Sequence, residues 1–288
     1  MQSPDYCKTL DCTVVIPVYN RKKLIHRALQ SVFDQSAPAA QVIVVDDGSN
    51  DGSCQLLDAC YPKVQVIQQP RSGVSAARNA AIRSSRCKWI AFLDSDDEWM
   101  PEKLQRQFAW IQEHPDIRIV HSDEIWIRNS VRVNPKIKHA KSGGWIFPKC
   151  LPRCVISPSA AVIEKSVFSE LGLFDEELPV CEDYDMWLRI AHKYPVGYLD
   201  DKLVIKYGGH SDQLSKAYPA IDRYRIASLL KLLNTNTLTS SQRRLATDEM
   251  MRKIQIYVNG AASRGKDAEV RRYEALAEQF RSDLTVEV

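Results

Sequence analysis

The sequence lacks a long apolar run, a strong net charge and an apolar leader, and each absence excludes a class of protein. The longest apolar runs, such as residues 42–45, are far too short to span a bilayer. The net charge of +3, without a basic stripe interleaved with aromatic residues, gives no reason to expect a nucleic-acid partner. The first residues carry neither the basic nor the apolar region of a secretory signal. We therefore expect a cytoplasmic protein that binds no nucleic acid.

Metal-binding cysteine pairs are also absent. The eight cysteines are scattered, and none of them forms a Cys-x-x-Cys pair. Cys150 and Cys154 are the closest in sequence, but no matching second pair follows them. Free thiols are therefore expected in place of a structural zinc site.

A glycine-rich phosphate loop is missing after the first apolar segment, which continues as PVYNRKK. A nucleotidyltransferase should show a glycine-rich loop with basic residues at this point. A dinucleotide-binding oxidoreductase should show G-x-G-x-x-G there. Both classes are excluded on this ground.

What the sequence does contain is a regular alternation of strand and helix patterns. The 288 residues, 44% of them hydrophobic and 26% charged, suffice for one large or two smaller domains. Short apolar strands are predicted at 13–16, 42–45, 64–67 and 88–93, with helical patterns between them. This alternation predicts an α/β fold with a doubly wound, mostly parallel sheet and flanking helices.

Three local signals set the expected ends of these elements. Pro17 is expected to end the first strand, and Asn20 to cap the helix that follows it. Pro101 suits the first position of a later helix. From about residue 219 the pattern is helical to the end, with Val270, Tyr273, Ala277 and Phe280 on one face of the last helix.

Polar clusters follow three of the predicted strands, as PVYN at 17–20, DDGS at 46–49 and DSDD at 94–97. Ligands of open parallel sheets bind beyond the carboxyl ends of the strands, so the three clusters should share one edge. Asp94 and Asp96, one residue apart, can reach a common centre from the same side. Their hard oxygen ligands suit Mg²⁺ or Mn²⁺, so we expect one of these ions rather than a merely solvated loop.

The segments VVIPVYNR, VIVVDDGSNDGS, GVSAARNAAI, FLDSDDEWMP and CEDYDMWLR resemble, in order and spacing, the family 2 glycosyltransferases of the GT-A fold. The resemblance covers roughly residues 12–215. It implies transfer of a sugar from a nucleotide donor, usually with inversion and with a divalent metal. It also implies a catalytic domain at 1–218, with a nucleotide-sugar part at about 12–123 and an acceptor part at about 124–218. A helical extension at 219–288 would follow.

The resemblance places a nucleotide-sugar site at the strand ends. Tyr19 would stack on the base, and the Asp47 carboxylate would accept from a uracil N–H. Arg78 would face the nucleotide or help to fix the acidic cluster, since a guanidinium binds both phosphate and carboxylate. The complete predicted set is Pro17, Tyr19, Asn20, Asp46, Asp47, Gly73, Arg78, Asp94 and Ser95.

The resemblance also separates the acids that follow the fourth strand. Asp96 would bind the metal and link it to the diphosphate, while Asp94 would meet the ribose or the donor sugar. His210, after two glycines, would contact the metal or the diphosphate. Asp97 and Glu98 are expected only to shape the turn into the next helix.

A second acidic pair, Glu182–Asp183, begins the helical segment EDYDMWLRIA. An inverting transfer needs one carboxylate to take the proton of the acceptor hydroxyl. By the resemblance, Asp183 is this general base and Glu182 supports it.

Two functions from different classes follow. The first is an inverting glycosyltransferase, with a UDP-sugar as the expected donor and a glycan, polysaccharide or lipid-linked acceptor. The alternative is a catalytically silent nucleotide-sugar-binding or scaffold module of a glycan assembly complex, although no key acid is missing. The helical extension could pack on the catalytic domain, form a homodimer or touch the inner face of a membrane.

Overall fold

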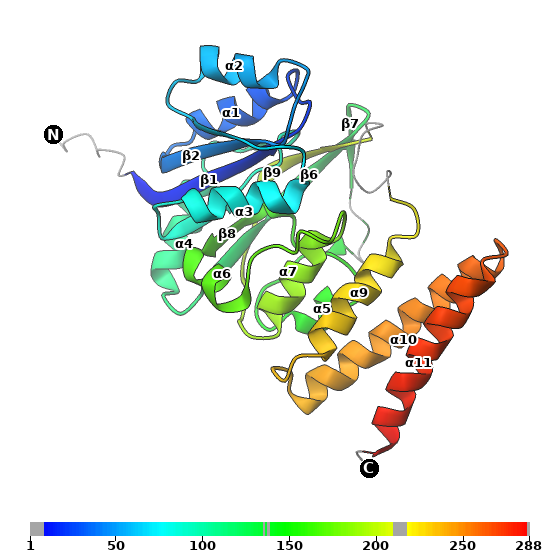
Figure 1. Cartoon of the computed structure of the whole chain (residues 1–288). Helices are drawn as coiled ribbons and strands as arrows, with labels where there is room; N and C mark the ends of the chain where they lie inside the picture. Colours follow the sequence, from blue (N-terminus) through cyan, green and yellow to red (C-terminus); the bar gives the residue numbers. More distant parts are fainter. Residues whose placement is uncertain (1–8, 135, 137–138, 210–217, 287–288) are drawn as a thin grey trace.

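One mixed β-sheet runs through the centre of the molecule (Figure 1). The structure is a computed structural model that describes residues 9–134, 136, 139–209 and 218–286. Within that part of the chain the strand order is β3-β2-β1-β4-β8-β6-β9-β5, and β7 pairs with β6. The strands are β1 (Leu10–Val18), β2 (Ala39–Asp46), β3 (Gln65–Gln68), β4 (Trp89–Phe92), β5 (Glu98–Trp99), β6 (Ile119–Arg128), β7 (Val131–Val133), β8 (Ala161–Glu164) and β9 (Gly197–Gly208).

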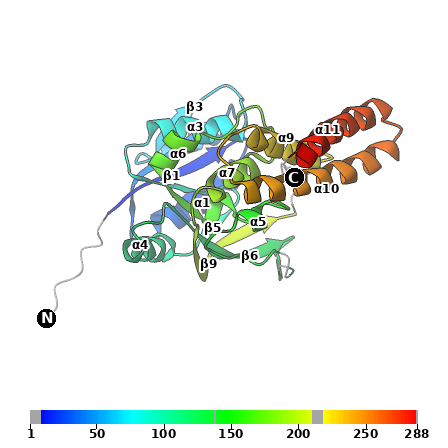
Figure 2. The ribbon, with the colours of Figure 1, turned by 90° about the horizontal axis from the view of Figure 1, so that it is seen from below.

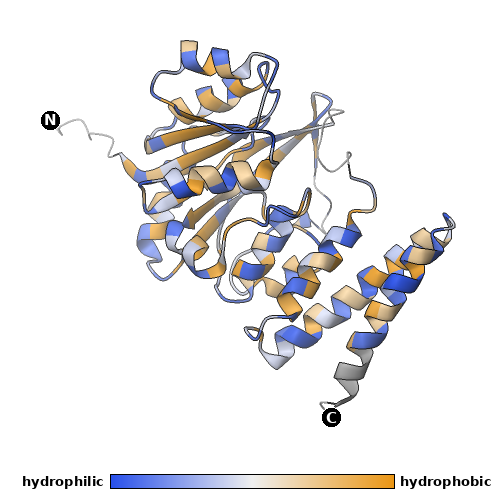
Figure 3. Cartoon of the chain, viewed as in Figure 1, coloured by the Kyte–Doolittle hydropathy of each residue, from blue (hydrophilic) through white to orange (hydrophobic). Residues whose placement is uncertain are grey.

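The central residues of β1, β2 and β4 are mostly apolar because both faces of the sheet are covered there. In β1, Val15 belongs to the apolar core on one face, and Val14 and Ile16 belong to the core on the other. Strands that are buried on both sides read as continuous apolar runs, and the hydropathy colouring of Figure 3 shows this. The helices on the first face are α3 (Val74–Ser84), α6 (Lys165–Leu171) and α7 (Glu182–Ala191), and those on the second are α1 (Ile25–Phe33), α2 (Ser53–Cys60) and α4 (Lys103–Glu113).

β3, β2, β1 and β4 are parallel to one another. Their carboxyl ends therefore meet at one edge, which carries the segments 17–20, 46–49 and 94–97. The predicted convergence of the three polar clusters is confirmed. It follows from the parallel pairing alone.

The second half of the sheet is built differently. β8 runs antiparallel to both β4 and β6, β6 and β9 are parallel, and β5 is antiparallel to β9. The short helix α5 (Phe147–Cys150) and the 3₁₀ turn η2 (Pro158–Ala160) connect these strands. The fold is the α/β class that the sequence predicts, with a sheet that is parallel in its first half and mixed in its second.

In the part of the chain that the structure describes, the sheet is followed by the helices α9 (Asp222–Leu233), α10 (Ser240–Ala262) and α11 (Asp267–Val286). α9 packs between α7 and α10, and α10 and α11 form a hairpin that projects from the body (Figures 1 and 2). Thr239 and Gln242 form a capping box at the start of α10. Ala277 and Phe280 are buried, with Val270 and Tyr273 packed beside them, so the predicted apolar face of the last helix is confirmed. No helix of the described residues is long and apolar enough to cross a bilayer.

The predicted ends of three elements are wrong. β1 continues through Pro17 to Val18, because it pairs with β4 only as far as Val15 and proline is tolerated where one side is unpaired. Asn20 caps no helix, since α1 begins at Ile25. Pro101 precedes α4, whose first residue is Lys103.

Candidate functional site

The acidic turn after β4 is anchored by Asp97, which lies buried beneath it. Its Oδ2 accepts from the Ser159 hydroxyl at 2.6 Å, and its Oδ1 accepts from the Tyr207 backbone N–H at 3.1 Å. Burial raises the pKa of Asp97 well above its usual range, against the attraction of Lys206. Asp97 therefore ties the turn to β9 and η2, a role that local sequence does not reveal.

The sequence predicts that Glu98 favours the start of the next helix, and this prediction is wrong. Glu98 opens β5, opposite Ile205 of β9, and accepts from the Tyr207 hydroxyl at 2.8 Å. The segment is drawn into the sheet because β9 supplies a free edge beside it.

Asp94 and Asp96 reach the surface of the strand-end edge, with side chains 27% and 20% exposed. Ser95 between them is buried. An Arg21 nitrogen lies 3.7 Å from Oδ2 of Asp96, and Arg78 binds Oδ1 of Asp94. Two partly accessible carboxylates thus lie at the strand-end edge.

This pair fits a Mg²⁺ or Mn²⁺ ion that keeps open positions. Among the described residues, no three His, Cys, Asp or Glu side chains gather as a complete metal cage. Mg²⁺ commonly uses one or two carboxylates and completes its shell with phosphate oxygens and water. Two partly exposed carboxylates at a strand end suit that kind of site. His210, the other predicted ligand, lies outside the described residues.

Arg78 joins the two acidic clusters. From α3, its guanidinium donates to Oδ1 of Asp94 at 2.8 Å and to Oε1 of Glu182 at 2.7 Å, and only 2% of Arg78 is exposed. Both carboxylates hold the pKa of Arg78 above its usual range. Of the two predicted roles, the structure shows the second, in which Arg78 fixes the acidic cluster.

Glu182 and Asp183 lie at the N-terminus of α7, directly after Cys181, whose φ is 68°. Glu182 is buried, and burial together with the neighbouring Asp183 raises its pKa to about 7, against the opposing pull of Arg78. Asp183 is only partly buried. The exposed member of the pair is thus the one that can meet a bound molecule.

Asp183 itself is held by two donors. The N–H of Tyr184 donates to Oδ1 at 2.7 Å, and the thiol of Cys154 donates to Oδ2 at 3.0 Å. The scattered positions of the cysteines contain no signal for this contact, because Cys154 and Asp183 are 29 residues apart.

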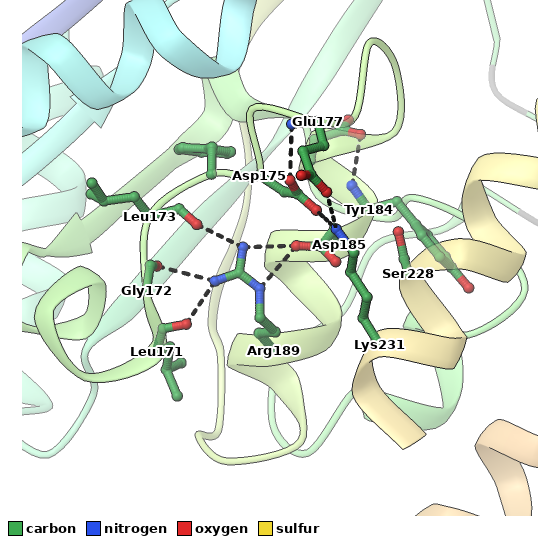
Figure 4. Close-up of polar contacts among 12 residues, drawn as sticks. Leu171, Gly172, Leu173, Asp175, Glu177, Tyr184, Asp185, Arg189, Ser228 and Lys231 are labelled. Carbon is green, nitrogen blue, oxygen red and sulfur yellow. Dashed lines mark hydrogen bonds and ion pairs between the residues drawn. The ribbon is translucent and has the colours of Figure 1, made fainter. Parts of the chain in front are cut away.

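Asp185, two residues further along α7, does not belong to this group. Its carboxylate pairs with Arg189, 2.7 Å away, and Arg189 also donates to the carbonyls of Leu171, Gly172 and Leu173 (Figure 4). Asp185 therefore fixes the loop before α7 in place.

At the other end of the edge, Tyr19 and Asp47 lie in the loops after β1 and β2. The Arg71 guanidinium lies 4.1 Å from the centre of the Tyr19 ring. The Asp47 carboxylate accepts from the backbone N–H groups of Ser72 and Gly73 at 2.7 and 2.8 Å. Asp47 thus holds the loop before α3, and Arg71, which sequence reasoning missed, covers the aromatic ring.

The remaining predicted residues shape these loops. Asp46 accepts from the N–H of Ser49 at 2.9 Å, and Asn20, with a φ of 52°, accepts from the N–H of Asn50 at 2.9 Å. Gly48 has a φ of +80°, and an added Cβ would lie 2.9 Å from the backbone nitrogen of Arg71. The loops can approach each other this closely only with glycine there. Pro17 pairs with Val45 at the end of β1.

A buried ion pair supports the second half of the sheet. Lys141 lies 2.8 Å from Oε2 of Glu124, with side chains 5% and 3% exposed. Lys141 also bonds the Ser122 carbonyl, and the ring of His121 bonds the Ser142 carbonyl. These contacts hold the segment around Lys141 against β6.

We predict that Glu124→Gln lowers stability most at neutral pH. Lys141 lowers the pKa of Glu124 from 4.5 to about 2 despite its burial. A carboxyl group whose pKa is lower in the folded than in the unfolded protein stabilises the fold at any pH above the unfolded pKa. For Glu124 this contribution is lost as the pH falls from about 4.5 towards 2. The difference in unfolding free energy between wild type and variant should therefore be on the order of 3 kcal/mol at pH 7 and shrink below pH 4.5. Urea titrations at several pH values measure it, and a pH-independent difference would contradict the assignment.

Comparison with known proteins identifies a family whose match covers the strand-end edge described above. The pattern of "Glycosyl transferase family 2" matches residues 13–172. An uncharacterized glycosyltransferase of Rickettsia felis is 30% identical over 193 residues, which is 66% of this chain and 32% of that protein. The chain thus spans about a third of the length of this relative. TuaG of Bacillus subtilis, a putative teichuronic acid biosynthesis glycosyltransferase, is 38% identical over 106 residues, or 35% of this chain and 42% of TuaG.

Solved structures share the fold. Residues 1–349 of Staphylococcus aureus TarS, in complex with UDP-GlcNAc, superpose with a TM-score of 0.71 at 18% identity, covering 94% of this chain and 92% of that one. The mannosyltransferase PcManGT of Pyrobaculum calidifontis, in complex with GDP-Man and Mn²⁺, gives a TM-score of 0.62 at 18% identity, covering 98% and 85%.

Proposed function

This chain is a glycosyltransferase of family 2, and we propose that it moves a sugar, with inversion, from a nucleotide-diphosphate donor to a hydroxyl of a glycan, polysaccharide or lipid-linked acceptor. One observation carries the proposal. Buried Arg78 joins Asp94, at the donor end of the sheet, to Glu182, which adjoins the partly exposed Asp183. A donor-binding group and a candidate base are thereby held in one rigid cluster.

Asp183 acts as the general base in this proposal. As the acceptor oxygen bonds to the anomeric carbon, its proton passes to the Asp183 carboxylate. The bond from that carbon to the diphosphate oxygen breaks on the opposite face, so the configuration inverts. One base suffices, since no covalent sugar–enzyme intermediate forms. Glu182, bound by Arg78, supports the geometry without contacting the acceptor.

The nucleoside end is formed by Tyr19, Asp47 and the loop around Gly73. The Tyr19 ring offers a stacking surface, and Arg71 adds positive charge next to it. Because TarS was solved with UDP-GlcNAc, we take a UDP-sugar as the donor. Pro17, Asn20, Asp46 and Ser95 would hold the loops that surround it.

Asp96, together with Asp94, would hold a divalent ion against the donor diphosphate. Such an ion neutralises the charge of the departing diphosphate. PcManGT, which was solved with Mn²⁺, supports Mn²⁺ as the first ion to test.

The acceptor side is assigned to the half of the sheet formed by β6, β8 and β9, within the proposed catalytic domain at 1–218. The printed description of TuaG, a teichuronic acid enzyme, favours a polysaccharide acceptor. The helices α9 and α10 pack on this domain through α7 and α5, which supports a bracing role for the extension at 219–288.

We predict that, in the presence of Mn²⁺, the purified chain hydrolyses one member of a panel of nucleotide sugars or transfers its sugar to an acceptor. EDTA should lower the rate of this reaction at least about tenfold. Release of the nucleoside diphosphate is the measurement, and addition of Mn²⁺ should restore it. Asp96→Asn should weaken the response to Mn²⁺ while Asp200→Asn, at an exposed position of β9, should not. Nucleotide-sugar binding without turnover on any acceptor would favour the silent binding module instead.

A further inference from the structure

We propose that Cys154 is a positioning residue for the general base, holding the oxygen of Asp183 that takes the acceptor proton. This inference rests on the proposed function and names a residue outside the motifs of the sequence.

The two carboxylate oxygens of Asp183 have different partners. Oδ1 is bound at 2.7 Å by the N–H of Tyr184, within the first turn of α7. Oδ2 accepts a hydrogen bond from the Cys154 thiol at 3.0 Å. A carboxylate oxygen has a second lone pair, so Oδ2 can still accept a proton from a bound hydroxyl. The thiol therefore sets the direction of the reactive lone pair.

The position of Cys154 suits it to donate this hydrogen bond to Asp183. It lies in the connection between α5 and η2. The Ile156 carbonyl, 3.2 Å from the sulfur, is a second acceptor for its single proton, and the charged Asp183 oxygen at 3.0 Å is the nearer and stronger one. Burial and the Asp183 carboxylate raise the pKa of the Cys154 thiol well above its usual range. The sulfur thus keeps its proton and remains a donor, without adding a second negative charge beside the base.

A hydrogen bond donated to the carboxylate fixes the direction of the free lone pair on the same oxygen. Loss of the donor should therefore lower kcat more than it weakens donor binding. Other ionisable groups around the pair stay in place in such a variant. They are Glu182 and Cys181 beside Asp183, Arg78 behind Glu182, Cys150 on α5, Lys206 on β9 and Arg225 on α9.

The test compares Cys154→Ala and Cys154→Ser with wild type, using nucleoside diphosphate release from pH 5 to pH 9. For the alanine variant we expect kcat to fall about tenfold, with the donor KM unchanged within about twofold. The serine variant, which keeps a donor, should recover most of the rate. Cys60→Ala, at an exposed cysteine on α2, is the matched control and should behave as wild type.

The outcomes separate this inference from the function it rests on. An active wild type, an inactive Asp183→Asn variant and an unaltered Cys154→Ala variant would refute the role of Cys154 alone. A wild type without turnover on any nucleotide sugar would refute both. An equal loss in the alanine and serine variants, accompanied by a lower melting temperature, would show that Cys154 only packs. A rise in the donor KM of Cys154→Ala as large as the fall in its kcat would also contradict the proposal.

Discussion

Asp183→Asn should reduce sugar transfer by about 10²–10⁴-fold in kcat while leaving donor binding intact. Asparagine keeps the shape of the side chain but only one oxygen, so it can accept from one of the two donors, the Tyr184 N–H or the Cys154 thiol, which lie 2.7 and 3.0 Å from the carboxylate. It cannot take a proton at neutral pH. The loss should therefore fall on kcat, because the nucleotide contacts come from other elements.

Steady-state transfer kinetics and calorimetric titration of the nucleoside diphosphate measure the two quantities separately. Asp200→Asn removes an exposed carboxylate from β9 and should retain full activity. If Asp183→Asn turns over at the wild-type rate, another group is the base, and Glu182, whose pKa is raised to about 7, becomes the first alternative.

Arg78→Met should lower both the free energy of unfolding and the rate of sugar transfer, and by more than the replacement of Arg83, the other arginine of α3. The two hydrogen bonds of Arg78, at 2.7 and 2.8 Å, serve two carboxylates that would lose their cation. Removing one partner of a buried ion pair costs about 3–5 kcal/mol. Transfer should fall as well, since Asp94 and the start of α7 would no longer be held together.

The matched control for this change is Arg83→Met on the same helix. The Arg83 side chain is 60% exposed and lies 3.5 Å from Glu176, so its loss should cost about 0–1 kcal/mol. Arg78→Lys should rescue only part of the effect, because one ammonium cannot replace the guanidinium fork that serves both acids.

The loss of unfolding free energy in Arg78→Met should shrink as the pH falls, since protonated carboxyl groups need no cation. Urea unfolding at pH 5 and pH 8 tests this, and equal stability of the Arg78 and Arg83 variants would contradict the bridging role.

Much of the edge at which β1, β2 and β4 end is predictable from sequence, because the residues that form it follow directly after short apolar strands. The apolar runs predict parallel strands, and parallel strands bring Tyr19, Asp47 and Asp94 to one edge whatever the details of packing. Errors occur where a distant segment intervenes. Glu98 reads as a helix start from its neighbours, yet it enters a strand because β9, more than a hundred residues away in sequence, pairs with it.

The sequence by itself determined the fold class, the edge at which the three polar clusters meet and the acids that line it. These follow from periodicity and from the direction of the strands. Only the tertiary structure decided how the acids divide their work. It buried Asp97 as an anchor, joined Asp94 to Glu182 through Arg78, and placed the Cys154 thiol against Asp183. Contacts of this kind depend on side chains from separate elements meeting in three dimensions, and neither periodicity nor spacing along the chain encodes those meetings.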